Sequence, residues 1–274
     1  MISNRAARCS TSLRASQSVL LTACRVRARR LLAWFMAALV FLFATLHGWH
    51  GSRLGEDANA QDLRPRIYVY LHTDSKFAAL EKILKEKLPL LTVTVFGRFR
   101  DLEDAMQARP PDALLARSAL LVKLNVQPAL QGVRGNADWE PYVLLSQDLS
   151  RDEPLAGKVI GVVDLLGRTG TQEFVAKLLG TDDIKLKRVT KTEDLLPLLQ
   201  FSAADAVLVP SVAVKDVTDR SRLPLTVRPL PDARVKLAAV GVLNVNTRNL
   251  VVNQVLRLDS ETLRTLGVER WRAP

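Results

Sequence analysis

Cysteine, histidine and aromatic residues are scarce over most of this 274-residue chain. Both cysteines, Cys9 and Cys24, lie in the first 60 residues, and His72 is the one histidine after residue 60. The rest of the chain therefore lacks the residues for a cysteine nucleophile, a disulfide framework or a zinc site with several Cys or His ligands. Aromatic residues make up only 5% of the sequence, which argues against a surface that stacks nucleic-acid bases. We expect no metal, no cofactor and no nucleic-acid partner.

Sequence motifs of common enzyme classes are absent as well. The chain contains no G-x-S-x-G, H-E-x-x-H or P-loop pattern. Its carboxylates are scattered, so no acid–base pair can be recognised. We therefore predict that the protein binds a molecule and catalyses no reaction.

The net charge of +11 is divided between two regions of the chain. Residues 1–60 hold eight Arg, no Lys and two acidic residues, and so contribute +6. The remaining residues contribute +5, from 31 basic and 26 acidic side chains without a long basic run. A mildly basic body favours anionic ligands but does not indicate nucleic acid.

The first 60 residues have the pattern of an export signal. Four arginines between Arg25 and Arg30 precede an apolar run from Leu31 to Leu46. As a helix this run is roughly 24 Å long, short of the ~30 Å hydrocarbon core of a bilayer. Ala58-Asn59-Ala60 offers a small-residue cleavage site. We predict an N-terminal extension and signal peptide over 1–60 and a periplasmic protein. The alternative is an uncleaved signal that anchors the protein to the inner membrane.

The body of the chain alternates between strand and helix patterns. A first β-α-β-α-β unit has its expected elements at 67–71, 77–88, 92–96, 101–106 and 113–116. A second unit has strands expected at 158–163, 185–189 and 206–209, with helices between them. Two such units predict α/β structure with mostly parallel sheets.

The remaining segments connect or follow these two units. We expect an irregular connection over 118–141, a strand at 142–145 and a tight loop at 167–171. Later elements are expected as strands at 225–227 and 235–243, a helix over 250–256 and a short helix from Ser260 to Gly267.

Four segments carry a likeness to a known family. They are DLEDA at 101–105 with PDALL at 111–115, YVLL at 142–145, LAGKVIGV at 155–162 with RTGT at 168–171, and LRTLGVERW at 263–271. In this order they resemble the phosphate/phosphonate-type substrate-binding proteins of ABC transporters, and the resemblance covers nearly all of residues 66–272. The chain departs from that family at RTGT, where a Ser-Thr-Ser-Gly-like run is usual.

The resemblance implies a type 2 periplasmic binding protein fold, in which two Rossmann-like lobes with mixed, mostly parallel sheets are joined by two crossover strands. Lobe 1 would comprise residues 61–145 plus 237–274, and lobe 2 residues 146–236. The implied function is that of a monomeric solute-binding protein. It would capture a small anionic, phosphate- or phosphonate-like ligand in the interlobe cleft and deliver it to an ABC transporter permease. The alternative is a periplasmic domain of the same fold that reports a ligand or partner to a signalling receptor.

The loop at 167–171 is the first candidate binding segment, because open α/β lobes bind ligands at the C-terminal ends of strands and near helix N-termini. Arg168 can contact a carboxylate or phosphate, and Thr169 and Thr171 can donate hydroxyls. Gly170 permits close approach of the backbone. The alternative for this segment is a plain helix cap.

Other candidates follow other strands. Thr73 and Ser75 lie after the first strand, where the alternative role is helix capping. Arg117 and Ser118 follow the third strand, and their alternative is a solvated loop. Ser146 and Ser211 are further candidates, because each also follows an expected strand.

Overall fold

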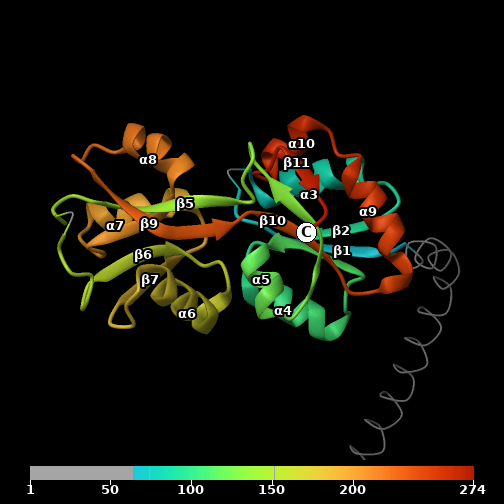
Figure 1. Ribbon diagram of the computed structural model, residues 1–274, viewed down its shortest axis with the longest axis horizontal. Helices are drawn as coiled ribbons and strands as arrows, with labels where there is room; N and C mark the ends of the chain where they lie inside the picture. The colour runs from blue at the N-terminus through green and yellow to red at the C-terminus, as the bar shows by residue number, and fades with distance from the viewer. Residues whose placement is uncertain (1–63, 74, 151) are drawn as a thin grey trace, which may run out of the picture. The chain divides into compact units, whose positions relative to one another are not determined.

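The computed structural model describes residues 64–73, 75–150 and 152–274. These residues form two α/β lobes, each with its own mixed sheet (Figure 1). This architecture confirms the predicted fold class. No helix among the described residues has the length and apolar character needed to cross a bilayer. The predicted signal peptide lies outside the described residues.

Lobe 1 is built on a six-stranded sheet with the order β11-β4-β10-β3-β1-β2. Strands β1, β2 and β3 are parallel, whereas β10 runs antiparallel to β3 and β4, and β11 antiparallel to β4. The strands are β1 (Arg66–Tyr70), β2 (Thr92–Val95), β3 (Ala113–Arg117), β4 (Pro128–Val133), β10 (Ala238–Val242) and β11 (Arg270–Arg272).

Alternating side chains of β1 show how this sheet is covered on both faces. Ile67 and Val69 pack in one apolar cluster, and Tyr68 and Tyr70 pack in another on the opposite face. Helices α3, α9 and α10 contribute to the first cluster, and α4 and α5 to the second (Figure 1). Their bounds are α3 (Phe77–Lys87), α4 (Phe99–Ala108), α5 (Ser118–Lys123), α9 (Arg248–Leu256) and α10 (Ser260–Thr265), and the 3-10 turn η3 (Val245–Thr247) precedes α9.

Lobe 2 has a five-stranded sheet with the order β7-β6-β8-β5-β9. Helix α6 packs on one face, and α7 and α8 pack on the other. The strands are β5 (Trp139–Ser146), β6 (Val159–Val163), β7 (Lys185–Val189), β8 (Ala206–Pro210) and β9 (Thr226–Lys236). The helices are α6 (Gly167–Leu179), α7 (Leu195–Gln200) and α8 (Val214–Arg220), and the 3-10 turns η1 (Thr192–Asp194) and η2 (Ser211–Ala213) precede α7 and α8.

Two short crossovers join the lobes, one between β4 and β5 and the other between β9 and β10. They touch each other, because the backbone N–H of Leu237 donates to the carbonyl of Asp138 at 2.8 Å. The predicted boundary after residue 145 differs from this arrangement, since β5 pairs with β8 and β9 in the second sheet. The strand pattern at 142–145 shows that a strand exists but not which sheet it joins.

Two expected loops are regular structure instead. The connection expected over 118–141 contains α5, β4 and the start of β5. The loop expected at 167–171 is the first turn of α6, which begins at Gly167 with φ 73°. A Cβ at Gly167 would lie 2.3 Å from Cδ1 of Phe99, so a side chain at this position would collide with lobe 1.

Candidate functional site

The candidate site lies where the strand ends of the two lobes meet. Two hollows are lined by residues from both lobes. The residues from lobe 1 lie at or after the C-terminal ends of β1, β2 and β3, and those from lobe 2 at or after the C-terminal ends of β6, β7 and β8. This is the position at which open α/β sheets bind ligands. We therefore treat these hollows between the lobes as the candidate site.

Direct contacts between the lobes divide this cleft in two. The hydroxyl of Tyr70 donates to the carbonyl of Asp164 at 2.7 Å, and Nζ of Lys123 donates to the carbonyl of Leu166 at 2.6 Å. Leu166 also packs with Phe99 and Tyr70 in one apolar cluster that spans both lobes. Two separate hollows lie beside these contacts, and we call them the outer and the inner hollow.

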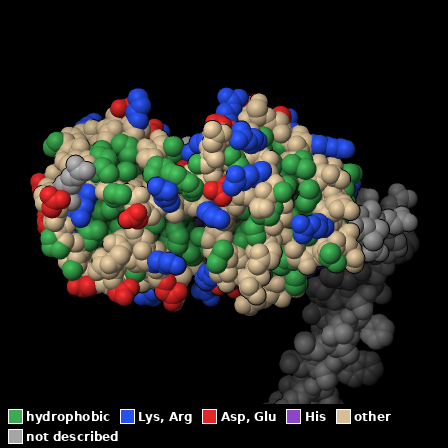
Figure 2. Space-filling model, in the orientation of Figure 1, with side chains coloured by type: hydrophobic (Ala, Val, Ile, Leu, Met, Phe, Trp, Pro, Cys, Tyr) green, Lys and Arg blue, Asp and Glu red, His purple; other side chains and the backbone are tan. Residues whose placement is uncertain are grey.

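The outer hollow is a volume of about 530 Å³ lined by four arginines. Arg98 and Arg100 come from lobe 1, and Arg168 and Arg188 from lobe 2. Figure 2 shows Lys and Arg side chains on both sides of the junction between the lobes. Three carboxylates, those of Glu103, Asp104 and Asp164, line the same hollow.

The two pairs of arginines differ in their ionic partners. Nε of Arg98 lies 2.9 Å from Asp101, and Nε of Arg100 lies 3.9 Å from Asp104. Arg168 and Arg188 have no ion pair with any described residue, so the lobe 2 wall presents free guanidinium groups to the hollow.

The inner hollow is much smaller, about 40 Å³. Four side chains with polar groups line it: His72 and Arg117 of lobe 1, and Tyr142 and Thr192 of lobe 2. The rest of its lining is apolar, namely Val162, Val163, Leu165, Phe174, Val175, Leu208 and Pro210. The hollow is thus a small, largely apolar space with a cation on one wall.

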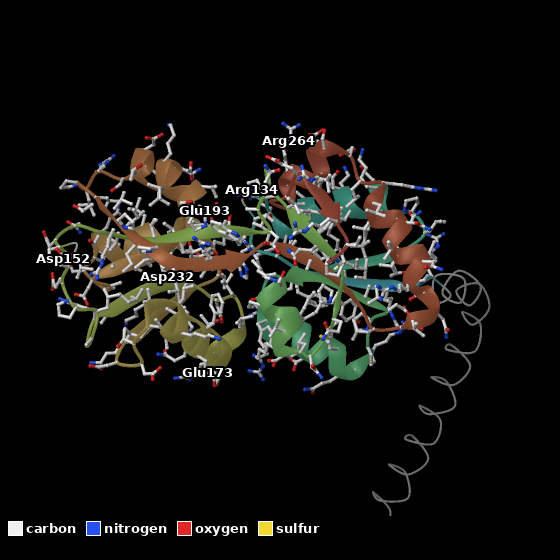
Figure 3. The ribbon with its side chains drawn as sticks, viewed as in Figure 1. Arg134, Asp152, Glu173, Glu193, Asp232 and Arg264 are labelled. Atoms are coloured by element: carbon white, nitrogen blue, oxygen red, sulfur yellow. The ribbon has the colours of Figure 1, made fainter. Side chains whose placement is uncertain are left out.

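Glu140 is the counter-ion of that cation. Its side chain is only 3% exposed, and its Oε1 lies 2.6 Å from Nη1 of Arg117. Its other oxygen, Oε2, accepts a hydrogen bond from Nη1 of Arg134 at 3.1 Å, and Nη2 of Arg134 donates to the carbonyl of Gly267 at 2.5 Å. Arg134 lies near the junction of the lobes (Figure 3). One carboxylate of lobe 2 is therefore shared by two arginines of lobe 1.

Burial governs the charge states around the inner hollow. It lowers the pKa of His72 to about 4, with a further decrease from nearby Arg117 and a partial increase from Asp164, so this imidazole is neutral at pH 7. Burial also raises the pKa of Tyr142, which keeps the phenol protonated. The pKa of Arg117 is raised, because the interactions with Tyr142 and Glu140 exceed the opposing effect of burial.

Two predicted residues line these hollows, and a third lines a hollow beside them. Arg168 lines the outer hollow, and Arg168 and Thr169 line an adjoining surface hollow with Arg188. Arg117 lines the inner hollow. Arg168 and Thr169 belong to lobe 2 and Arg117 to lobe 1, so these predicted residues come from opposite sides of the cleft.

Thr171 and Gly170 have structural roles in this arrangement. Thr171 is fully buried, its hydroxyl donates to Oδ1 of Asp164 at 2.6 Å, and it accepts from the N–H of Leu166 at 2.9 Å. A Cβ at Gly170 would lie 2.9 Å from Nζ of Lys123. These two residues shape the turn that carries Arg168 and lie in neither hollow.

The predicted serines and Thr73 lie outside both hollows. Ser118 is buried and donates its hydroxyl within lobe 1, where the carbonyl of Leu237 and Oε1 of Gln131 each lie 2.9 Å away. Ser146 is fully buried, and its hydroxyl has no hydrogen-bond partner among the described residues. Ser211 is the half-buried first residue of η2. The Thr73 hydroxyl lies 3.5 Å from the carbonyl of Ser75.

Several residues of the hollows were not predicted. Arg98 and Arg100 follow β2, so the strand-end rule that selected Arg117 could have selected them too. Arg188 lies inside β7, and Glu140, which lines neither hollow but pairs with Arg117, is the second residue of β5, so no local pattern marks either residue. Among the described residues, no group of three His, Cys, Asp or Glu side chains could hold a metal ion.

Comparisons with family models and with curated proteins find no match, whereas solved structures share the fold. XAC2383 from Xanthomonas citri bound to ATP is 11% identical, with a TM-score of 0.53 over 77% of this chain and 91% of that one. The GluR0 ligand-binding core from Nostoc punctiforme in complex with L-glutamate is 13% identical, with a TM-score of 0.49 over 74% and 96%. Holo ArgBP from T. maritima is 18% identical, with a TM-score of 0.47 over 73% and 92%.

The protein has a type 2 periplasmic-binding-protein fold. Two lobes with mixed sheets, joined by two crossovers, are the arrangement that the sequence resemblance implies. At such low identities the likeness to the solved structures concerns the fold alone.

Proposed function

We propose that this protein is an exported solute-binding protein that captures a small anionic solute between its lobes. The observation that carries the proposal is the outer hollow, in which four arginines from both lobes line one volume of about 530 Å³. Guanidinium groups bind carboxylates and phosphates through paired hydrogen bonds. Anions of both kinds, phosphate- and phosphonate-like solutes included, fit this lining.

The lobe 2 wall provides the anchor for the anion. Arg168 is the second residue of α6, so it lies beside the free N–H groups and the partial positive charge of that helix terminus. The carboxylate of Asp164 on the same wall already accepts a hydrogen bond from Thr171. Arg168 and Arg188 are therefore the charged groups on this wall that have no counter-ion among the described residues.

Binding between the lobes would favour their closed arrangement. A solute that contacts Arg168 in lobe 2 and Arg98 or Arg100 in lobe 1 interacts with both walls only while the lobes are close. Such differential contact shifts the population toward the closed state. A membrane permease of an ABC transporter would recognise that state and accept the solute, and the predicted signal peptide would export the protein to the periplasm.

The test is calorimetry on protein expressed as the full chain, with phosphate, methylphosphonate, sulfate, glutamate and ATP as probes. ATP is included because XAC2383, which shares the fold, is bound to it. We expect at least one anion to bind. Arg168→Ala combined with Arg188→Ala should weaken that binding about 100-fold, since each charged hydrogen bond contributes roughly 1.5–3 kcal/mol.

The matched control is Arg222→Ala combined with Arg257→Ala. It removes the same charge from two exposed positions outside the outer hollow. We expect less than a twofold change in affinity from this control. If the wild-type protein bound no anion, or if both double variants lost affinity equally, capture at the outer hollow would be wrong.

A further inference from the structure

Helix α9 has apolar residues on two opposite faces. Val251 and Val255 are fully buried against the sheet of lobe 1. On the outer face, Val245 of η3, Val252 and Leu256 follow one another at a spacing of seven and four residues, so they form a second apolar stripe. Val245 is 76% exposed and Leu256 is 51% exposed. A helix that is apolar on both faces is normally covered on both, whereas the described residues cover only the inner one.

This outer stripe lies at the end of lobe 1 that faces away from lobe 2 (Figure 1). Strands β1, β2 and β3 start at that end, because their C-terminal ends face the hollows. Leu90 precedes β2, and Leu243 follows β10, whose last residue pairs with the first residue of β3. Such a concentration of exposed apolar side chains is typical of an interaction surface. It comprises four of the eight large hydrophobic residues that are exposed among the described residues: Leu90, Leu243, Val245 and Leu256.

The same end of lobe 1 is positively charged. Arg248 and Arg257 flank the outer stripe at the two ends of α9, and Nη1 of Arg64 donates to the carbonyl of Pro89 at 3.0 Å, beside Leu90. All three arginines are exposed, and none forms an ion pair with a described residue. The sequence 233–258, which includes α9, contains no Asp or Glu. We call these three arginines and the four exposed aliphatic residues the α9 surface.

We propose that the α9 surface binds to the surface of an anionic phospholipid bilayer. Val245 and Leu256 enter the interface between the headgroups and the acyl chains, and the three arginines contact lipid phosphates. Helices that lie in the membrane interface have this composition, with apolar residues on the face toward the lipid and arginines beside them. The α9 surface lies at the opposite end of lobe 1 from the hollows, so this binding is independent of solute capture.

The position of the N-terminal segment favours a bilayer as the partner. The described chain starts at Arg64, at the α9 end of lobe 1, and residues 47–63 separate it from the predicted apolar run Leu31 to Leu46. If that run stays in the inner membrane, which is the alternative to cleavage, the α9 surface is the part of the folded body that is nearest to it along the chain.

Charge disfavours two other partners for the α9 surface. Residues 1–60 of the same chain carry a charge of +6, so they would bring further cations to three arginines that already lack a counter-ion. A second copy in a two-fold symmetric contact would place the same arginines opposite each other. Anionic lipids instead supply the missing negative charge, and each arginine close to an anionic membrane strengthens binding.

The first experiment measures contact with lipid at single positions of the full chain. A bimane fluorophore is attached to the Leu256→Cys variant in a background of Cys9→Ser and Cys24→Ser. The probe is a vesicle of phosphatidylcholine and phosphatidylglycerol with brominated acyl chains, which quench only labels that enter the bilayer. We expect about twofold quenching at position 256, because the outer stripe enters the interface. The matched control is Phe201→Cys on lobe 2, which is 81% exposed and should not be quenched.

The second experiment tests the arginines with the same label at position 256. Arg248→Gln combined with Arg257→Gln should lower the ratio of quenched to unquenched label about thirtyfold, since each arginine near an anionic surface contributes about 1 kcal/mol. The matched control, Lys185→Gln combined with Arg222→Gln, removes the same charge from exposed positions of lobe 2 and should leave the ratio unchanged. Every variant carries the same N-terminal segment, so these differences belong to the α9 surface.

Three results would overturn membrane binding by the α9 surface. Equal quenching at positions 256 and 201 would show that α9 does not face the bilayer. Equal effects of the two charge variants would show that the arginines do not bind lipid. A label at position 256 that is already in apolar surroundings without vesicles, and does not change when they are added, would show that another part of the chain or a second copy covers the stripe. Analytical ultracentrifugation would then distinguish a monomer from a dimer. None of these results affects solute capture at the outer hollow, which calorimetry tests separately.

Discussion

The outer and inner hollows contain the same kind of cation in opposite surroundings. In the outer hollow Arg168 is exposed and without an ionic partner among the described residues, and water screens its charge. In the inner hollow Arg117 is mostly buried and depends on Glu140, which is itself almost inaccessible to solvent. An exposed guanidinium can attract anions at no cost to the fold, whereas a buried one must be integrated into the fold. The two hollows should therefore respond differently to the same substitution.

The largest difference is expected from alanine at the two arginines. Arg117→Ala leaves Arg134 as the only partner of a buried carboxylate, so the free energy of unfolding should fall by about 3 kcal/mol. Arg168→Ala should change it by less than about 0.5 kcal/mol, because the side chain is exposed and unpaired. Urea denaturation followed by circular dichroism measures both. Equal effects would mean that Arg117 is solvated and that the contrast between the hollows does not exist.

The same contrast explains which residues could be predicted from the sequence. Arg117 and Arg168 were predicted because each follows a strand, and that position depends on local pattern. Glu140 reaches Arg117 only because β5 and the first crossover bring the two residues together across the hinge. No local pattern encodes such a contact between distant segments.

Local sequence pattern also fails to predict two other features, namely the roles of hydroxyl side chains and the presence of short helices and strands. A threonine at a helix start, such as Thr171, has the same sequence signature whether it contacts a ligand or holds the backbone, and only burial distinguishes the two roles. The segments that became α5 and β4 are six residues each, and the Pro and Gly residues that follow α5 favoured an irregular prediction. Strands β1 and β6 are only five residues long, but their short runs of β-branched and other apolar residues suit strands that are buried on both faces, and such a run can be recognised without tertiary information.

Protonation of His72 provides a second way to test the burial of the inner hollow. Burial lowers its pKa from 6.5 to about 4, so between these values the unfolded chain binds a proton that the folded protein does not. The contribution of the neutral His72 to the free energy of unfolding is therefore fully present above pH 6.5 and is lost as the pH falls to 4. The loss should reach about 3 kcal/mol.

The measurement for His72 is the free energy of unfolding between pH 7 and pH 4, for the wild type and for His72→Gln. Their difference isolates this imidazole from the carboxylates that titrate in the same range. The wild type should lose more stability than the variant. Parallel curves would show that His72 is solvated and that the inner hollow is open to water.

The turn between the hollows depends on a single hydroxyl. Thr171→Val keeps the shape of the side chain but removes the hydrogen bonds to Asp164 and to the N–H of Leu166. Because both partners are then left unsatisfied in a largely buried turn, the free energy of unfolding should fall by about 2 kcal/mol. The matched control is Thr169→Val on the same helix, which is exposed and should stay within about 0.5 kcal/mol. Similar losses in both variants would contradict a structural role specific to Thr171.

The smallest effect is expected at the contact that separates the hollows. Tyr70→Phe removes the hydrogen bond to Asp164 of the other lobe, and Tyr68→Phe removes an equivalent bond to Arg109 within lobe 1. Each should cost about 1 kcal/mol of stability, because both tyrosines are similarly buried. Only Tyr70→Phe should also favour separation of the lobes, since its bond crosses between them. Small-angle X-ray scattering should then show a larger radius of gyration for Tyr70→Phe than for Tyr68→Phe. Identical radii would mean that the apolar contacts of Leu166 and Phe99 hold the lobes together without this bond. The hydrogen bond of Tyr70 would then not be needed to keep the lobes close.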